Sequence, residues 1–375
     1  MARLGDVCKI VSGSTPSTTA TDYWDGDIKW ITPAELDENS FYITDSVRHI
    51  TELGRTKTGL SYMPIGTVIL SSRAPIGKTA IAGCEMCCNQ GFKNLICSDK
   101  IHNEYLYFFL KGKTEFLNSL GRGATFKELS KNIVENIEVP LPSYEEQIKI
   151  SGHMRKIEEL LRLRKQQLSK LDELVKSRFI ELFGDCKNEV LIGDVISISR
   201  GASPRPISAF ITNSVDGVNW IKIGDVSENS LYITKTEERI TPEGAKKSRM
   251  VHKGDFILSN SMSFGRPYIL GINGCVHDGW LIMSDFKETF NELYLYHAIR
   301  SDDVQYQFSG KVNGATVKNL NSELVKNTFI KVPPMELQEQ FAAFVEQVDK
   351  SKLAIQKSLG QLETLKKSLM QKYFG

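Results

Sequence analysis

The phrase GATFKELS (residues 123–130) returns as GATVKNLN (residues 314–321), 191 positions later in a chain of 375 residues. Its neighbours return as well, and the offset stays between 188 and 193 along the chain. The clearest pairs are LGDV (4–7) with IGDV (192–195), FYITDSVRHIT (41–51) with LYITKTEERIT (231–241), GTVILSSRAPIG (66–77) with GDFILSNSMSFG (254–265), EYLYFFL (104–110) with ELYLYHA (292–298), and VPLPSYEEQ (139–147) with VPPMELQEQ (332–340). A repeat of this extent predicts an internal duplication.

Each copy begins with a mixed segment, at residues 1–143 and 185–335. Short apolar runs such as GTVILSS, bounded by Gly, Pro and Ser, indicate strands. Residues 103–120 have helical periodicity with aromatic side chains on one face. We therefore expect an α/β or α+β globular domain in each copy.

Each copy closes with a charged segment, at residues 144–184 and 336–375, whose apolar residues recur every 3.5 positions. That period is typical of a coiled coil. We expect the two helices to pack on each other, antiparallel, and the alternative is that each packs only on its own domain. The residues expected to pack are Ile150, Met154, Ile157, Leu161, Leu168 and Leu171 in the first helix, and Phe341, Phe344, Val348, Ile355, Leu362 and Leu365 in the second.

The expected architecture is two similar domains separated by a pair of long helices and related by a pseudo-two-fold axis. A helix of about 38 residues spans roughly 57 Å. LFG (182–184) leads directly into the second domain. By symmetry, YFG (373–375) should lie beside the start of the first domain, so that the chain ends are neighbours.

Composition is that of an ordinary globular protein, with 41% hydrophobic and 25% charged residues and a net charge of +2. The start of the chain lacks the apolar core of a signal peptide, so we expect a cytoplasmic protein. Cys84 and Cys87 match half of a zinc-ligand spacing. Their counterparts in the second copy are Ile272 and Cys275, which favours buried structural thiols. We expect no metal and no cofactor.

The order domain, helix, domain, helix resembles the specificity subunit of type I restriction–modification enzymes. GATFKELS with VPLPSYEEQ, GATVKNLN with VPPMELQEQ, and SSRAPIGKTAIAGCEMCCNQGF (71–92) carry the resemblance. It implies that the domains are target recognition domains for double-stranded DNA and that the helices are spacers. By the same resemblance, the helices hold two modification (methyltransferase) subunits, and restriction (nuclease/translocase) subunits join that core.

Two different domains in a fixed frame would read a split, non-palindromic site, because half-site spacing follows protein geometry. The chain contains no Asn/Asp-Pro-Pro motif for a flipped adenine and no G-x-x-x-x-G-K-[ST] loop for nucleotide phosphates. We therefore expect that the chain does not catalyse a reaction by itself. The alternatives are a protein-interaction scaffold and an enzyme with an unrecognised site.

Candidate DNA-binding residues lie on matched polar loops and in the repeated phrase. In that phrase, Thr125 and Glu128 fit a helix capping box, which would place Lys127 in the first helical turn near a phosphate. A solvated lysine is the alternative. Arg and Asn side chains can bind guanine and adenine edges with two hydrogen bonds. The candidates are Arg73, Lys78, Arg122, Lys127, Arg200, Arg205, Asn260, Arg266 and Lys318. Trp30 and Trp220, in matched apolar strands, are expected in the core.

Overall fold

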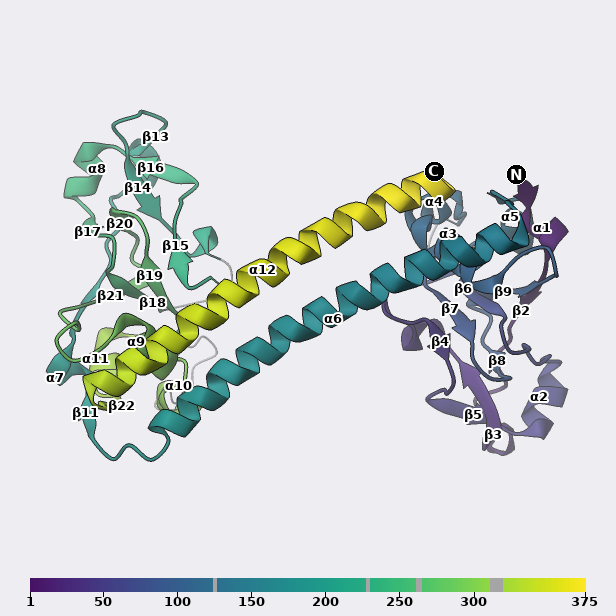
Figure 1. Ribbon diagram of the computed structural model, residues 1–375, viewed down its shortest axis with the longest axis horizontal. Helices are drawn as coiled ribbons and strands as arrows, with labels where there is room; N and C mark the ends of the chain where they lie inside the picture. The colour runs from purple at the N-terminus through teal and green to yellow at the C-terminus, as the bar shows by residue number, and fades with distance from the viewer. Residues whose placement is uncertain (124–126, 227–229, 261–264, 311–319) are drawn as a thin grey trace. The chain divides into compact units, whose positions relative to one another are not determined.

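The computed structural model describes residues 1–123, 127–226, 230–260, 265–310 and 320–375. The chain divides into two compact units, one formed by Met1–Gln166 with Gln356–Gly375 and the other by Gln167–Ile355. Each unit contains one globular domain and a part of each long helix, α6 (Tyr144–Phe183) and α12 (Met335–Phe374) (Figure 1).

The main sheet of the first unit has five strands in the order β2-β9-β6-β7-β4, and a three-stranded sheet has the order β5-β3-β8. Neighbouring strands are antiparallel except for β4 with β7 and β3 with β8. The strands are β1 (Ala2–Arg3), β2 (Cys8–Ser12), β3 (Trp24–Ile31), β4 (Tyr42–Ile43), β5 (Arg48–Ile50), β6 (Val68–Ser71), β7 (Thr79–Ala82), β8 (Cys87–Cys88), β9 (Phe92–Cys97) and β10 (Glu138–Val139). The shorter helices are α1 (Leu4–Val7), α2 (Glu52–Thr58), α3 (Asn103–Gly112), α4 (Thr114–Leu120) and α5 (Lys131–Glu135), with 3-10 turns at Thr21–Tyr23 and Pro33–Glu35.

The main sheet of the second unit repeats that of the first strand for strand, with the order β12-β21-β18-β19-β15. The second sheet differs, since it has five strands in the order β13-β16-β14-β20-β17 where the first unit has three. The strands are β11 (Glu189–Leu191), β12 (Ser197–Arg200), β13 (Ile211–Thr212), β14 (Val218–Ile221), β15 (Tyr232–Ile233), β16 (Glu238–Ile240), β17 (Arg249–Val251), β18 (Phe256–Ser259), β19 (Pro267–Leu270), β20 (Gly274–Val276), β21 (Trp280–Ser284) and β22 (Phe329–Lys331). The shorter helices are α7 (Ile192–Val195), α8 (Pro242–Lys246), α9 (Glu292–Ile299), α10 (Asp302–Gly310) and α11 (Ser322–Lys326), with 3-10 turns at Ile207–Ala209 and Ile223–Asp225. The predicted duplication and mixed fold are confirmed.

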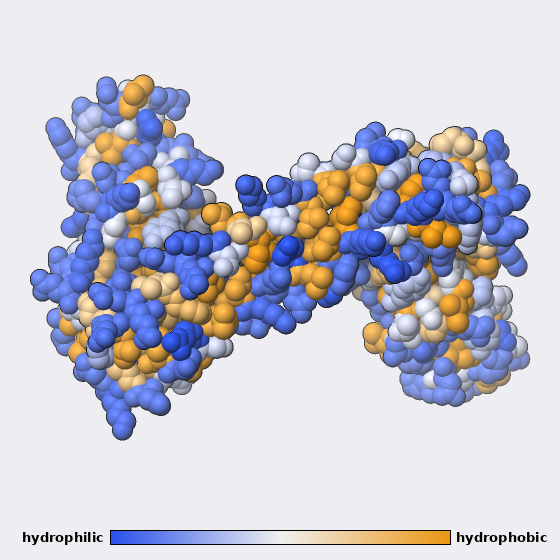
Figure 2. Space-filling view, in the orientation of Figure 1, coloured by the Kyte–Doolittle hydropathy of each residue, from blue (hydrophilic) through white to orange (hydrophobic). Residues whose placement is uncertain are grey.

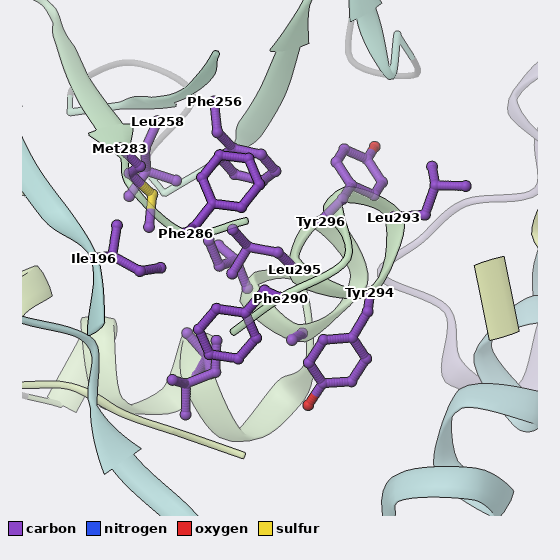
Figure 3. Close-up of a cluster of buried hydrophobic side chains, with 14 of the residues drawn as sticks. Ile196, Phe256, Leu258, Met283, Phe286, Phe290, Leu293, Tyr294, Leu295 and Tyr296 are labelled. Carbon is purple, nitrogen blue, oxygen red and sulfur yellow. The ribbon is translucent and has the colours of Figure 1, made fainter. Parts of the chain in front are cut away.

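A helix buried on nearly every side closes each core. Figure 3 shows part of the core cluster of the second unit, to which Tyr294 and Leu295 of α9 belong together with Phe256 of β18 and Met283 of β21. In the first unit, all residues from Glu104 to Leu110 of α3 are buried. A helix that is apolar on all faces belongs in the interior of a fold.

The two core helices correspond with a shift of one residue from the alignment of EYLYFFL with ELYLYHA. The Tyr105 hydroxyl donates to the Pro140 carbonyl at 2.9 Å, and the Tyr294 hydroxyl donates to the Lys331 carbonyl at 2.8 Å. Tyr105 therefore matches Tyr294, whereas the sequence alignment paired it with Leu293. The hydrogen bond of the buried hydroxyl determines this register, because an unpaired buried hydroxyl is costly.

The long helices run antiparallel within each unit. In the first, Lys366 pairs with Glu158 at 2.8 Å, and Phe374 shares a core cluster with Ile150. Lys366 lies eight residues before Phe374 in α12, and its partner Glu158 lies eight residues after Ile150 in α6. The two helices therefore run in opposite directions. In the second unit, Lys352 pairs with Asp172 at 2.7 Å, and Phe341 packs on Phe183 with ring centroids 5.5 Å apart. The predicted antiparallel packing is confirmed in both units.

The helix ends also pack on the domains, as the alternative reading expected. Ile150 and Met154 belong to the core cluster of the first domain, and Phe341 and Val348 belong to that of the second. The helices therefore pack on the domains as well as on each other, and the alternative that each packs only on its own domain is wrong. Of the remaining residues expected to pack, those that are half-buried are Leu161, Leu168, Leu171, Phe344, Ile355 and Leu362, and Ile157 is buried.

The prediction that Leu365 packs between the helices is wrong, because its side chain is 46% exposed. The inward position belongs to Lys366, which reaches Glu158 with its amine. Lys366 is the counterpart of Val175, a buried residue of α6, at the repeat offset of 191. A search for apolar residues alone skips an inward lysine and selects the leucine beside it, although a lysine can bury its aliphatic stem.

Both chain ends lie in the first unit, as the symmetry argument predicted (Figure 1). Leu4 and Phe374 belong to the same core cluster, and Ala2 packs against it. Strand β1 pairs with β10, the strand that precedes α6. The beginning and end of the chain thus help to anchor the long helices on the first domain.

The two tryptophans expected in the core are found there, whereas of the cysteines expected to be buried Cys84 is not. Trp30 is 3% exposed and Trp220 is 2% exposed. Each pairs through a parallel ladder with a buried cysteine, Cys87 or Cys275. Cys84 is only partly buried, and its sulfur accepts a hydrogen bond from the Lys29 amine at 3.7 Å. Within the described ranges, no helix combines the length and apolar character needed to span a membrane.

Candidate nucleic-acid interface

The loop between β6 and β7, residues 72–78, is held by the hydroxyl of Ser71. That oxygen donates to the Pro75 carbonyl at 2.7 Å and accepts from the Lys78 amide at 2.8 Å. Gly77 has φ +97°, a left-handed conformation that favours glycine. In the second unit, Ser259 accepts from the Arg266 amide at 3.1 Å, and Gly265 has φ +69°. One loop framework thus occurs in both domains.

Three segments meet at this loop in the first unit. The Ser72 amide donates to the Gly91 carbonyl at 2.7 Å, and the Leu129 amide donates to the Ser72 carbonyl at 2.9 Å. The repeated phrase is therefore attached to the loop by its buried leucine. Because its backbone pairs with the loop, the phrase brings its neighbouring polar side chains to the same surface.

The second unit makes the matching connections. The Asn260 amide donates to the Gly279 carbonyl at 3.0 Å, and the Leu320 amide donates to the Asn260 carbonyl at 2.8 Å. The recurrence of the phrase thus has a structural cause, since the same strand-to-loop junction is built twice.

In the first unit, the three segments surround an open hollow of about 460 Å³. Glu128 lies in it between two cations. Its carboxylate is 3.5 Å from Arg73 Nη1 and 3.2 Å from Lys93 Nζ. Gln90, on the turn before β9, hydrogen-bonds with Thr15. The lining residues are Thr32, Pro33, Ala34, Arg73, Ala74, Asn89, Gln90, Gly91 and Glu128.

In the second unit, Asp278 organises the corresponding surface. Its carboxylate accepts from the Ser203 hydroxyl at 2.9 Å and lies 3.4 Å from Arg205 Nη2. The Ser203 hydrogen bond, more than any other cause, lowers the pKa of Asp278. The Arg200 guanidinium donates to the Asp278 carbonyl at 2.9 Å. A shared backbone framework therefore carries different charged groups in the two domains.

Most of the candidate side chains lie on accessible surfaces. Arg122, Lys127, Arg200 and Arg205 are exposed. Arg73, Lys78 and Arg266 are partly exposed, and the Lys78 amine donates to the Pro33 carbonyl at 3.0 Å. The structure brings the backbones of Arg73 and Arg122 together at Glu128, with which both residues form isolated β-bridges.

Lys318 lies outside the described residues, as do Thr125 and Thr316, the expected helix caps.

The expected capping box is wrong for the described part of the phrase. Glu128 is not in a helix but forms β-bridges, so Lys127 is not in a first helical turn. Helix α5 begins at Lys131, and the Ser130 hydroxyl caps it by accepting from the Ile133 amide at 3.2 Å. Asn321 caps α11 in the same way. Serine and asparagine are both preferred N-cap residues. Because the residues before Ser130 and Asn321 pair with the loop, each helix begins only after its cap.

The prediction that Asn260 contacts a DNA base is also wrong. It is 3% exposed, and its side-chain amide donates to the Asp278 carbonyl at 3.0 Å. Its counterpart in the first unit, Ser72, is fully buried. Both residues support the loop from beneath, and neither presents its side chain to solvent.

Sequence reasoning missed Lys93, a buried lysine in the apolar strand FKNLIC. A signal was present, because the second copy has Leu281 at the matching position. The ladders pair Leu70 with Lys93 and Leu258 with Leu281. A charge that replaces an apolar residue in one copy of a duplicated core strand requires a partner, and Glu128 supplies it.

The duplicated domains, the antiparallel helices and the paired polar loops define a protein of the bipartite recognition class. The chain belongs to the family of the type I restriction modification DNA specificity domain, whose model matches residues 1–173 and 186–367.

Relatives of known type agree with that family. The specificity subunit of the type I restriction enzyme MjaIX from Methanocaldococcus jannaschii is 28% identical over 403 residues, which cover 99% of this chain and 91% of the relative. The specificity subunit of HindI from Haemophilus influenzae is 26% identical over 148 residues, covering 39% of this chain and 32% of the relative.

Solved structures share the fold. A chain from a study of complex assembly and conformational transition of the type I R-M system has a TM-score of 0.64 at 20% identity, covering all of this chain and 96% of its own length. The S subunit of the type I system of M. genitalium has a TM-score of 0.59 at 14% identity, covering all of this chain and 95% of its own length.

Proposed function

We propose that this chain is the DNA sequence-recognition subunit of a type I restriction–modification complex. The domains at 1–143 and 185–335 each read one half of a bipartite, asymmetric site in double-stranded DNA. The helices at 144–184 and 336–375 set the spacing between the halves. The chain itself supplies recognition, and adenine methylation and DNA cleavage belong to its partner subunits.

The observation that carries this proposal is that the corresponding surfaces of the two domains, built on one backbone framework, carry different charged groups. Arg73 and Glu128 lie together in the first domain, and Arg205 and Asp278 lie together in the second. Guanidinium groups bind the guanine edge, and carboxylates accept from the cytosine amino group. Two frameworks of one design with different side chains suit two half-sites of different sequence.

The long helices also offer surfaces on which protein subunits could dock. Hydrophobic residues are visible along them in the space-filling view (Figure 2). In the first unit, Leu160 is 44% exposed and Leu365 is 46% exposed; in the second, Leu174 is 48% exposed and Leu353 is 68% exposed. We assign these surfaces to two modification subunits, with restriction subunits joining the complex in the cytoplasm. Exposed apolar patches commonly mark protein interfaces.

A footprint of the purified complex tests the proposal. The chain, co-purified with its modification subunits, should protect two short blocks of duplex DNA separated by unprotected base pairs. Methylome sequencing of cells that express the complex should find methylated adenine in the same bipartite motif. A complex that assembles but protects no DNA would contradict the proposal and favour the alternative, a protein-interaction scaffold.

A further inference from the structure

Lys93 is a buried cation beneath the proposed reading surface of the first domain. Its side chain is 8% exposed, and its amine lies 3.2 Å from Glu128 Oε1 and 3.4 Å from Ser72 Oγ. The other carboxylate oxygen, Oε2, is 3.5 Å from Arg73 Nη1. Three charged groups are therefore in contact, of which Lys93 is buried and the other two are partly exposed.

Lys93 and Arg73 differ in how strongly each depends on its ion pair with Glu128. Buried Lys93 has little water around it, so the carboxylate of Glu128 is its counter-charge. The Arg73 side chain is 37% exposed and can exchange Glu128 for water or another acceptor. Since Lys93 already neutralises Glu128, the attraction that holds Arg73 is reduced. Arg73 therefore lies beside Glu128 but is not held there tightly.

The second domain tolerates an apolar residue at the same place. Leu281 is 1% exposed and pairs with Leu258 in the ladder that corresponds to Leu70 with Lys93. The fold of this strand therefore does not need a lysine. The buried charge of the first domain needs another explanation.

We propose that Lys93 is a positioning residue for base recognition, which keeps Glu128 charge-compensated so that Arg73 is available to bind the edge of a guanine. This inference rests on the proposed function and names the base that the first domain reads. Guanine offers two acceptors, O6 and N7, that match the paired donors of a guanidinium group.

The variant K93M tests the sign of this effect. Methionine fills a similar volume without the charge, so Glu128 should hold Arg73 and the preference for guanine should fall about tenfold. The double variant K93M/E128Q removes the anion as well and should restore most of that preference. A residue that merely supports the fold would not be rescued by losing a second charge.

The measurement is competitive binding of the complex with its modification subunits to its own bipartite site. Each guanine of the first half-site is replaced in turn by 7-deazaguanine, which lacks the N7 acceptor. The ratio of the two affinities reports discrimination, whereas general damage lowers both affinities together. L281M, at the matching position of the second domain, is the control and should change neither half-site.

The variant K93L, which copies Leu281 of the second domain, provides an independent check if K93M does not fold. It should lower the guanine preference as K93M does, because it also leaves Glu128 without the buried cation. Unchanged discrimination in either variant, or a K93M/E128Q variant no better than K93M, would overturn the inference. So would a first half-site in which no guanine is sensitive to the replacement. If the wild-type complex protects no bipartite site, the proposed function fails instead.

Discussion

The ring of Phe374 lies against the ring of Tyr105, with centroids 5.1 Å apart, so the last turn of α12 completes the core of the first domain. Phe374 is 2% exposed and also packs against Phe109 at 6.0 Å. Phe183 makes the matching contact with Tyr294 in the second unit, at 4.7 Å. The end of each long helix is therefore a core element of a domain.

Replacement of this ring should loosen the first domain. We expect F374A to lower the free energy of unfolding by about 3–5 kcal/mol, because the substitution leaves a cavity in a packed core. Hydrogen exchange should become faster in α3, which contributes Tyr105 and Phe109. The control L365A removes a side chain that is 46% exposed and should have a much smaller effect. Equal exchange in α3 for F374A and the wild type would contradict this prediction.

His297 should make the second unit sensitive to acid. Its ring packs on Phe341 at 5.2 Å, and burial, aided by the nearby charges of Arg300 and Lys352, lowers its pKa to about 3. The unfolded chain binds a proton below about pH 6.5, whereas the folded chain does not. Stability should therefore fall as the pH drops from about 6.5 towards 3, by at most about 1.4 kcal/mol per pH unit.

The variant H297F removes that proton uptake and copies the first domain, where the matching residue is the buried Phe108. Urea unfolding of the second unit, followed by hydrogen exchange in α9, should lose much of its dependence on pH. The control H153N changes an exposed histidine of α6 and should leave the dependence as it is. The same pH slope in H297F and the wild type would assign the acid sensitivity to other groups.

Arg73 and Lys127 should affect DNA binding differently. We expect R73A to relax base preference in the first half-site only, with a loss of about 1–3 kcal/mol of discrimination. Lys127 is exposed, so K127A should weaken binding to all sequences and reduce the salt slope by about one. Titrations at several salt concentrations with matched and mismatched sites separate the two. A methylated motif that is unchanged in R73A would remove Arg73 from base reading.

The long helices should act as a spacer. One heptad inserted into each helix keeps the 3.5-residue pattern and lengthens each by about 10.5 Å. The unprotected gap in a footprint should therefore grow by about three base pairs, while the bases recognised in both halves stay the same. Insertion of four residues into α6 alone breaks the pattern and should change the gap or abolish binding. Altered bases in either half would show that the helices are not a spacer.

Residues of the candidate site were only partly predictable. Arg205 lies on the polar loop where the repeat placed it, and Arg200 is the last residue of strand β12, directly before that loop. Lys93 and Glu128, by contrast, are 35 positions apart and meet only because β9 and the repeated phrase flank the same loop. Asn260 has a side chain suited to adenine, yet it is buried beneath its loop. Residue type indicates what a side chain can bind, and burial decides whether it is available.

The sequence by itself determined the duplication, the mixed fold and the antiparallel helices. Repetition and hydrophobic periodicity can be read along the chain, and folding must bury the apolar residues that they place on one face. Tertiary structure alone decided the start of helix α5, where strand pairing of the phrase competes with helix formation. It also decided that Lys366 rather than Leu365 faces inward, since Glu158 lies close enough to form an ion pair with the lysine. Such choices depend on which groups approach one another in space, and spacing along the chain does not contain that information.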